Sequence, residues 1–234
     1  MARPTDPVAF HSEIASAFHE SYSRDANRAE RLAVWRSVFD RHLPQRASFA
    51  YDVGCGSGMI TCEIAARSDS VIAIDGSPAM LEIARKTLAG RDLTNVAFHE
   101  SRLPIADTSS MAKAPVVVSS SVIEYLDSIE EAFRFLRSLA APGALVVFSV
   151  SNKHSLSRRL VRLFHRLTGR PRYFGLVKHF LGMDDVRRLA AASGLDVVEQ
   201  IYFGGQDRLN RVFSVFLPQA ASTNMLLVVA RAKE

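Results

Sequence analysis

The chain has 234 residues, of which 48% are hydrophobic and 23% charged, and its formal net charge is +5. These values are ordinary for a globular protein, and the length suits one domain with a sizeable core. The mild basic excess comes without a nucleic-acid-binding motif, so we expect no nucleic-acid partner. No apolar run approaches the roughly 18 residues of a membrane span, and the first residues do not resemble a signal peptide, so we expect a cytoplasmic protein.

The N-terminal region predicts two amphipathic helices. The first covers Phe10–Tyr22, and the second runs from Ala29 to Leu43 and ends at Pro44. These helices could simply cover a sheet. We favour a lid over a ligand, because the glycine-rich segment that follows opens on the side where such a prefix can fold over it.

A glycine-rich turn follows the first predicted strand, Ala47–Tyr51, and precedes a predicted helix at Met59–Arg67. Gly54, Gly56 and Gly58 occupy alternate positions in this turn. Glycine permits a tight turn and a close approach of the backbone to a ligand. The start of the following helix offers unpaired N–H groups. The segment therefore predicts a ligand cradle.

The two cysteines, Cys55 and Cys62, lie in this loop and in the following helix. Their spacing is not that of a zinc site, and we expect reduced thiols without a chemical role. Acids and histidines do not recur at metal-ligand spacing, so we expect no metal centre.

The second predicted strand, Val71–Ile74, is continuously apolar and ends at Asp75. In doubly wound sheets an acid at this position can accept hydrogen bonds from ribose hydroxyls. The alternative is that Asp75 only caps the helix predicted at Pro78–Leu88. Its position 17 residues after Gly58 favours ribose binding.

The rest of the chain continues the alternation of apolar strands and helices. Helices are predicted at Ser128–Leu139 and Asp184–Ser193, and Val212–Leu217 could be a further strand. The alternation predicts an α/β fold with a doubly wound, mainly parallel, Rossmann-like sheet of about seven strands. The later strands are predicted at Asn95–Phe98, Pro115–Ser119, Ala144–Val150, Leu195–Tyr202 and Asn224–Ala230.

Two ligands fit this arrangement: a nicotinamide or flavin dinucleotide and S-adenosylmethionine. The dinucleotide fingerprint is G-x-G-x-x-G, whereas Met59 stands where its third glycine belongs. Asp52, two residues before Gly54, would repel a pyrophosphate and would suit an ammonium and a sulfonium. The electrostatics therefore favour S-adenosylmethionine.

The motifs of one family recur in order at Asp52–Gly58, Ile74–Leu81, Val116–Leu126 and Leu139–Leu145. Together they resemble the class I S-adenosylmethionine-dependent methyltransferases. The branch resembled is the small-molecule group that includes the ubiquinone-biosynthesis O-methyltransferases. The family's usual Glu-His pair is Glu124-Tyr125 here, so a role of that histidine does not carry over.

The resemblance implies an antiparallel last strand at or near the sheet edge and one methyltransferase domain over 1–234. Its parts would be a helical lid (1–46), a cofactor-binding half (47–150), a basic cap insert (151–183) and the C-terminal half of the sheet (184–234). The implied cofactor-binding residues are Asp52, Gly54, Gly56, Gly58, Asp75, Gly76, Met80, Glu100, Ser101 and Ser119. The motif containing Glu100 is shorter than usual.

The insert after the fifth strand is strongly basic, with eight Lys or Arg residues from Lys153 to Lys178 and no acid until Asp184. Three roles fit it. The segment Arg158–Arg172 could contact an anionic membrane as a peripheral amphipathic helix, or attract an acidic substrate to the active site. It could also be only a solvated face. Its apolar stripe consists of Leu156, Leu160, Leu163, Phe164 and Leu167.

We expect methyl transfer to a small-molecule hydroxyl in the biosynthesis of a secondary metabolite or quinone-like compound. The alternatives are N-methylation of an amine or heterocycle, a nucleotide-dependent oxidoreductase, and a non-catalytic, membrane-peripheral cofactor-binding partner. A hydroxyl acceptor benefits from a general base. His11 and His19 on the lid and His179 in the cap are candidates, and Tyr22 is a candidate for closing over the methionyl end of the cofactor.

Overall fold

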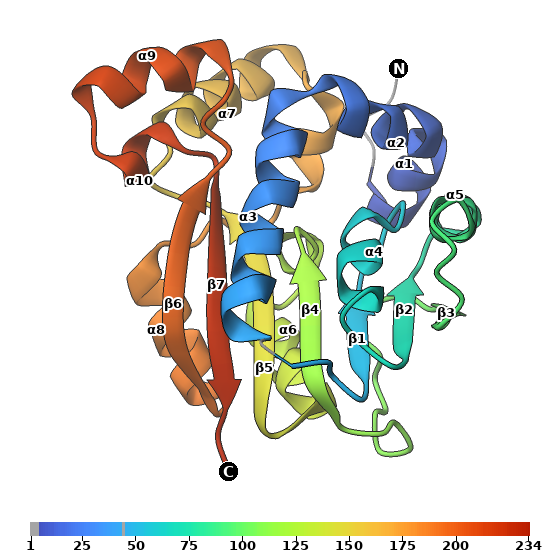
Figure 1. Ribbon diagram of the computed structural model, residues 1–234. Coiled ribbons are helices and arrows are strands. Elements are labelled where there is room, and N and C mark those ends of the chain that lie inside the picture. The colour runs from blue at the N-terminus through green and yellow to red at the C-terminus, as the bar shows by residue number, and fades with distance from the viewer. Residues whose placement is uncertain (1–4, 44) are drawn as a thin grey trace.

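The computed structural model describes residues 5–43 and 45–234 and contains a seven-stranded mixed sheet of order β3-β2-β1-β4-β5-β7-β6 (Figure 1). Among the strands of the described residues, β7 runs opposite to the other six, and it lies between β5 and the edge strand β6. This confirms the doubly wound, mainly parallel sheet with an antiparallel last strand. The strands are β1 (Ala50–Val53), β2 (Val71–Asp75), β3 (Val96–Glu100), β4 (Ala114–Ser120), β5 (Ala140–Ser151), β6 (Leu195–Phe203) and β7 (Met225–Ala232).

Helices cover both faces of the sheet (Figure 1). On one face Trp35 and Phe39 of α3 (Ala26–His42) and Ile64 of α4 (Met59–Ala65) pack on the central strands. On the other face α6 (Ile129–Leu139) contributes Phe133, and α8 (Met183–Ala192) contributes Val186. The central strands are buried between these layers, which explains why they read as unbroken apolar runs. α5 (Pro78–Ala89) connects β2 to β3.

The N-terminal region forms three helices instead of the two that were predicted. The predicted helix Phe10–Tyr22 is divided at Ile14 into α1 (Pro7–Glu13) and α2 (Ala15–Arg24). Asp25 ends α2 and caps α3 by accepting a 2.8 Å hydrogen bond from the Asn27 N–H. Figure 1 shows α1 and α2 above the carboxyl ends of β1 and β2. Pro44, the predicted end of the second helix, lies outside the described residues.

The segment Val212–Leu217, considered as a strand, belongs instead to the helix α9 (Arg208–Phe216). The valines favour a strand locally. The segment nevertheless forms a helix, because Asp207 caps it by accepting a 2.9 Å hydrogen bond from the Asn210 N–H. α9 leads to the short α10 (Gln219–Ser222), and the basic insert forms α7 (Leu156–Thr168) and the 3-10 helix η2 (Arg172–Leu176). None of the helices in the described part of the chain is long and apolar enough to span a bilayer.

Candidate functional site

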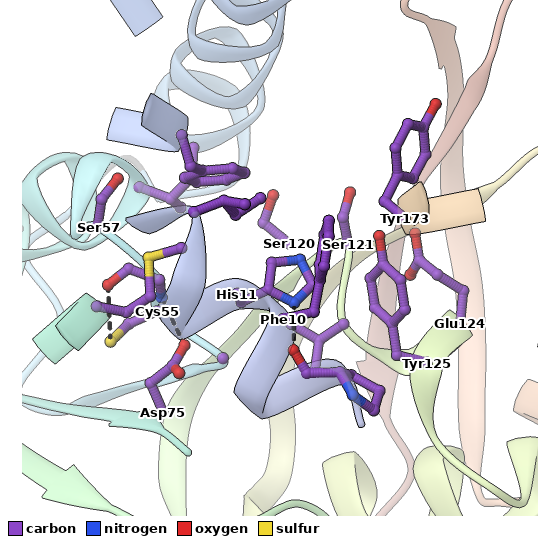
Figure 2. Close-up of a pocket in the computed structure, with 18 of the residues that line it drawn as sticks. Phe10, His11, Cys55, Ser57, Asp75, Ser120, Ser121, Glu124, Tyr125 and Tyr173 are labelled. Carbon is purple, nitrogen blue, oxygen red and sulfur yellow. Dashed lines mark hydrogen bonds between the residues drawn. The ribbon is translucent and has the colours of Figure 1, made fainter. Parts of the chain in front are cut away.

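A cavity of about 630 Å³ opens at the carboxyl edge of the sheet. Its walls come from the glycine loop, the end of β2, the loop after β4, and the inner sides of α1, α2 and α3. Figure 2 shows two ends: Cys55, Ser57 and Asp75 lie on one side, and Glu124, Tyr125 and Tyr173 on the other. Ligands of open α/β sheets bind at this edge.

The glycine loop has a left-handed backbone that side chains would obstruct. Gly54 has φ +75°, and a Cβ there would lie 2.1 Å from Cγ2 of Val122. Gly56 has φ +53° and lines the cavity, where a Cβ would approach only the Phe18 ring, at 3.9 Å. The backbone of this loop is therefore open to a ligand.

Gly58 has another role in the described structure. It caps α4 with φ +81°, and a Cβ there would lie 2.9 Å from Cδ1 of Leu88 and 3.1 Å from Ala84. Its missing side chain lets α4 pack closely on α5. Gly58 is not among the residues lining the cavity.

Asp52, near the end of β1, is a buried acid on the cavity wall. Its Oδ2 accepts a 2.7 Å hydrogen bond from the Thr61 hydroxyl, while Oδ1 has no partner among the described residues. Burial raises the pKa of Asp52 to about 7, and nearby Asp75 adds to the rise. A buried carboxylate oxygen without a partner suits a cationic ligand group.

Asp75 joins the glycine loop to the turn after β2. Its Oδ2 accepts the Gly56 N–H at 2.8 Å, and its Oδ1 accepts the Ser77 N–H at 2.9 Å. Burial raises its pKa. The cap of α5 is Ser77, whose hydroxyl accepts the Met80 N–H at 3.1 Å. Each carboxylate oxygen can accept a second hydrogen bond, so Asp75 could still bind a diol.

The helix α1 is fastened over this end of the cavity. Val8 packs so closely on Gly76 that a Cβ there would meet Cγ2 of Val8 at 2.9 Å. The Ser12 and Ser77 hydroxyls are 2.7 Å apart. On its other side Glu13 pairs with Arg172 of η2 at 2.7 Å. Tyr22 of α2 and Met80 of α5 also line the cavity.

The far end of the cavity is built around Glu124, which is buried. Its Oε1 lies 3.3 Å from the Ser151 hydroxyl, and its Oε2 has no partner among the described residues. Burial raises its pKa to about 7, against the opposing charges of Arg158 and Arg31. This end thus combines a carboxyl group with two guanidinium groups, which the sequence analysis did not identify as a site.

Arg31 of α3 fixes the loop after β4. Its Nη1 donates to the hydroxyls of Ser120 and Ser121 at 2.9 and 2.7 Å, and burial lowers its pKa. Ser121 has φ +58°, a strained conformation for a residue other than glycine. The same loop carries Val122, which packs against Gly54. Arg31 therefore helps to position the wall between the two ends of the cavity.

His11 lies between these two ends (Figure 2). Its Nδ1 is 2.7 Å from the Pro7 carbonyl oxygen. A carbonyl only accepts, so Nδ1 carries the hydrogen and Nε2 of the neutral ring keeps a lone pair. The His11 ring centroid is 5.4 Å from that of Tyr125.

The other predicted residues lie outside the cavity lining. His19 is half-buried on α2, and Nε2 of His179 is 3.0 Å from the Leu126 carbonyl oxygen. Glu100 is exposed at the end of β3, and the Ser101 N–H donates to the Asp75 carbonyl at 3.1 Å. Ser119 is buried and donates to the Val53 carbonyl at 3.0 Å. The neighbouring Ser120 and Ser121 line the cavity instead.

Both cysteines are buried free thiols, and burial raises the pKa of each. Within residues 5–43 and 45–234, no group of three or more His, Cys, Asp or Glu side chains could hold a metal ion.

A family model described as a methyltransferase domain matches residues 51–146. The chain is 28% identical over 130 residues to the methyltransferase nsrG of Aspergillus novofumigatus, covering 55% of this chain and 49% of that protein. It thus spans about half the length of that relative. It is 27% identical over 204 residues to the ubiquinone biosynthesis O-methyltransferase of Chromobacterium violaceum, covering 82% of each. The N-methyltransferase NodS of Bradyrhizobium japonicum, solved with S-adenosylhomocysteine, shares the fold, with a TM-score of 0.68, 19% identity and coverage of 98% and 100%.

Proposed function

The chain belongs to the class I S-adenosylmethionine-dependent methyltransferases, and we propose that it methylates a hydroxyl group of a small aromatic or quinone-like molecule. The position of His11 carries this proposal. It places a ring nitrogen with a free lone pair between the glycine-loop end of the cavity and the Glu124 end. The name of the Chromobacterium violaceum relative also favours O-methylation.

The residues at the first end fit the cofactor. Asp52 offers an unpartnered buried oxygen for an ammonium, Asp75 can accept from ribose hydroxyls, and the open backbone at Gly56 permits close approach. S-adenosylmethionine supplies a methyl group on a sulfonium, which is already a strong electrophile. The protein therefore has to hold the acceptor in line and exclude water, and the fastened α1 helix provides that exclusion.

The residues at the second end fit an aromatic acceptor. Tyr125 and Tyr173 lie beside Glu124 (Figure 2), Phe10 and Phe203 also line the cavity, and all four offer ring surfaces. A hydroxyl becomes a better nucleophile as it loses its proton, and His11 is the group placed to receive that proton at Nε2. The proton can leave once the lid opens.

An amine acceptor is the second candidate. The buried, unpartnered Oε2 of Glu124 could hold an amino group in the same cavity. An amine needs no strong base at the moment of transfer, so this alternative does not require His11 as a base.

Both candidates are tested by transfer of a radiolabelled methyl group from S-adenosylmethionine to matched phenols and arylamines, with the product identified by mass. The proposal expects labelled phenol ethers. It also expects His11→Ala to lower kcat by 10²-fold or more, within the usual range for a general base. His99→Ala, which changes an exposed histidine on β3, is the control. Labelling confined to arylamines, or an unchanged kcat in His11→Ala, would refute O-methylation assisted by His11.

A further inference from the structure

The helix α7 of the basic insert and the helix α9 after β6 expose large apolar side chains. Leu167 of α7 is 79% exposed, and Phe216 of α9 is 81% exposed. We call this set the apolar face. It consists of Leu160, Leu163, Phe164 and Leu167 of α7 and Leu209, Val212, Val215 and Phe216 of α9, each at least 44% exposed.

The two helices form one surface although they lie far apart in the sequence. α7 contacts both α9 and α10. Figure 1 shows them together at the end of the molecule beyond the carboxyl edge of the sheet. Their polar inner positions are used internally: the Ser157 hydroxyl donates to Oδ1 of Asn224 at 2.7 Å, and Nδ2 of Asn210 donates to the Gly204 carbonyl at 3.2 Å. Because these hydrogen-bonded polar residues occupy the protein-facing sides of α7 and α9, the apolar side chains of the two helices face solvent. Large exposed apolar side chains gathered on adjoining helices in this way mark an interaction site.

The charged side chains of α7 and α9 themselves are all positive. Six exposed arginines belong to α7, α9 or the turn after α7, and none forms an ion pair with a described residue. The segments 155–178 and 208–233 contain no Asp or Glu. The carboxylate of the neighbouring Asp207 is already bonded to Asn210 and Asn224. The arginines are Arg159, Arg162, Arg166, Arg170, Arg208 and Arg211.

Two arginines of the insert do not belong to this surface. Arg158 turns inward, where it lines the cavity and its Nη2 lies 3.2 Å from the Met225 sulfur. Arg172 pairs with Glu13 on α1. The insert thus has a cavity side and an outer side, and only the outer side is free to meet a partner.

We propose that the apolar face docks on the surface of an anionic lipid bilayer. Apolar side chains on the outer faces of amphipathic helices enter the boundary between headgroups and acyl chains, while flanking arginines bind anionic headgroups. A second copy of the chain is a poor occupant, because a two-fold interface would bring six arginines against six more. Nucleic acid is a poor occupant because six of the eight side chains of the face are aliphatic and offer no ring on which a base could stack.

Co-sedimentation of the chain with vesicles tests the proposal. One set of vesicles is phosphatidylcholine, and the other is an equimolar mixture with phosphatidylglycerol. The apolar variant is Leu167→Asp with Phe216→Asp, and the charge variant is Arg166→Gln with Arg211→Gln. Val198→Asp on β6 and Arg134→Gln on α6 change exposed residues of the same types away from the face and serve as controls. Thermal unfolding checks that every variant is folded.

The proposal expects binding to the anionic vesicles that weakens with salt, and at least tenfold weaker binding of the apolar variant. The charge variant should lose roughly 25-fold, since an arginine near an anionic surface contributes about fivefold. The controls should bind like the unmodified chain. Equal binding to neutral vesicles, or unchanged binding of folded face variants, would overturn the proposal. An absence of vesicle binding would also overturn the proposal. A dimer that Leu167→Asp dissociates would then identify a second copy as the occupant of the face, and binding of the face to an acidic protein would identify a protein partner.

Discussion

Replacing Asp52 with Asn tests how the glycine-loop end of the cavity works, because it removes the charge and keeps the shape. The side-chain oxygen of Asn can still accept the hydrogen bond that the Thr61 hydroxyl donates at 2.7 Å. The amide nitrogen would take the place of Oδ1, which has no partner among the described residues. Two effects of opposite sign follow, one on stability and one on affinity.

The effect on stability comes from the raised pKa of Asp52. The folded protein holds the proton up to about pH 7, whereas the unfolded chain loses it near pH 4, so the free energy of unfolding falls as the pH rises between these values. The rise of the pKa corresponds to about 4 kcal/mol as an upper bound. Asp52→Asn should therefore stabilise the ligand-free protein at pH 8 and leave its stability at pH 4 unchanged.

The effect on affinity has the opposite direction. An ionised carboxylate that hydrogen-bonds an ammonium contributes about 1.5–3 kcal/mol, so the variant should bind S-adenosylhomocysteine at pH 8 roughly 10- to 150-fold more weakly. For the unmodified chain, affinity should fall about tenfold for each pH unit below 7, because binding then requires Asp52 to lose its proton. This pH dependence should vanish in Asp52→Asn.

Denaturant unfolding at several pH values and calorimetric titration with S-adenosylhomocysteine measure both effects. The measurements belong in a Glu124→Gln background, since Glu124 also titrates near pH 7. Asp127→Asn is the matched control, because Asp127 lines the cavity but is exposed and paired with Lys178. A variant that is less stable at pH 8, or that binds as tightly as the unmodified chain, would refute this account of Asp52.

Three further predictions concern the loop and the core. Gly54→Ala should lower the free energy of unfolding by more than Gly143→Ala does. Gly143 has a similar φ of +72° but nothing within 4 Å of the new Cβ, so the loss of about 1–2 kcal/mol in Gly143→Ala measures the backbone strain alone. Equal losses in the two variants would contradict the clash of the Gly54 Cβ with Val122. Glu124→Gln should raise the free energy of unfolding at pH 8 but not at pH 4, because the buried carboxyl then no longer has to ionise; denaturant unfolding that shows a loss at pH 8 would exclude this. Trp35→Ala should cost about 3–5 kcal/mol, since this fully buried side chain joins α3 to the sheet, and a loss below 1 kcal/mol would show that α3 is not part of the core.

The sheet and the glycine-loop end could be predicted because their information is local. Strands buried on both faces are continuous apolar runs, and β2 and β5 appear as such in the sequence. Gly54, Gly56 and Asp52 occupy one short segment, and Asp75 ends the next strand. Parallel strands bring their carboxyl ends to the same edge, which places these residues together without any knowledge of side-chain packing.

The far end of the cavity could not be predicted in the same way, because it is assembled from distant segments. Arg31 comes from α3, Glu124 from the turn after β4, and Arg158 from α7. Packing also decides which arginines of the insert face the cavity and which face solvent. Arg158 and Arg159 are adjacent in the sequence, yet Arg158 lines the cavity and Arg159 is exposed. Val212 and Val215 favour a strand locally, whereas the residue that starts the helix α9, Asp207, lies five residues before Val212. The local pattern around the valines therefore does not reveal the helix.

The proposed methyl transfer depends on binding of S-adenosylmethionine by the glycine loop and Asp75. Equilibrium dialysis with radiolabelled S-adenosylmethionine, using S-adenosylhomocysteine and NADH as competitors, tests it most directly. We expect one site for each chain, displacement by S-adenosylhomocysteine but not by NADH, and loss of binding in Asp75→Ala with Asp127→Ala unaffected. Displacement by NADH at lower concentration than by S-adenosylhomocysteine would show a dinucleotide site, and full binding in Asp75→Ala would show that Asp75 does not hold the cofactor.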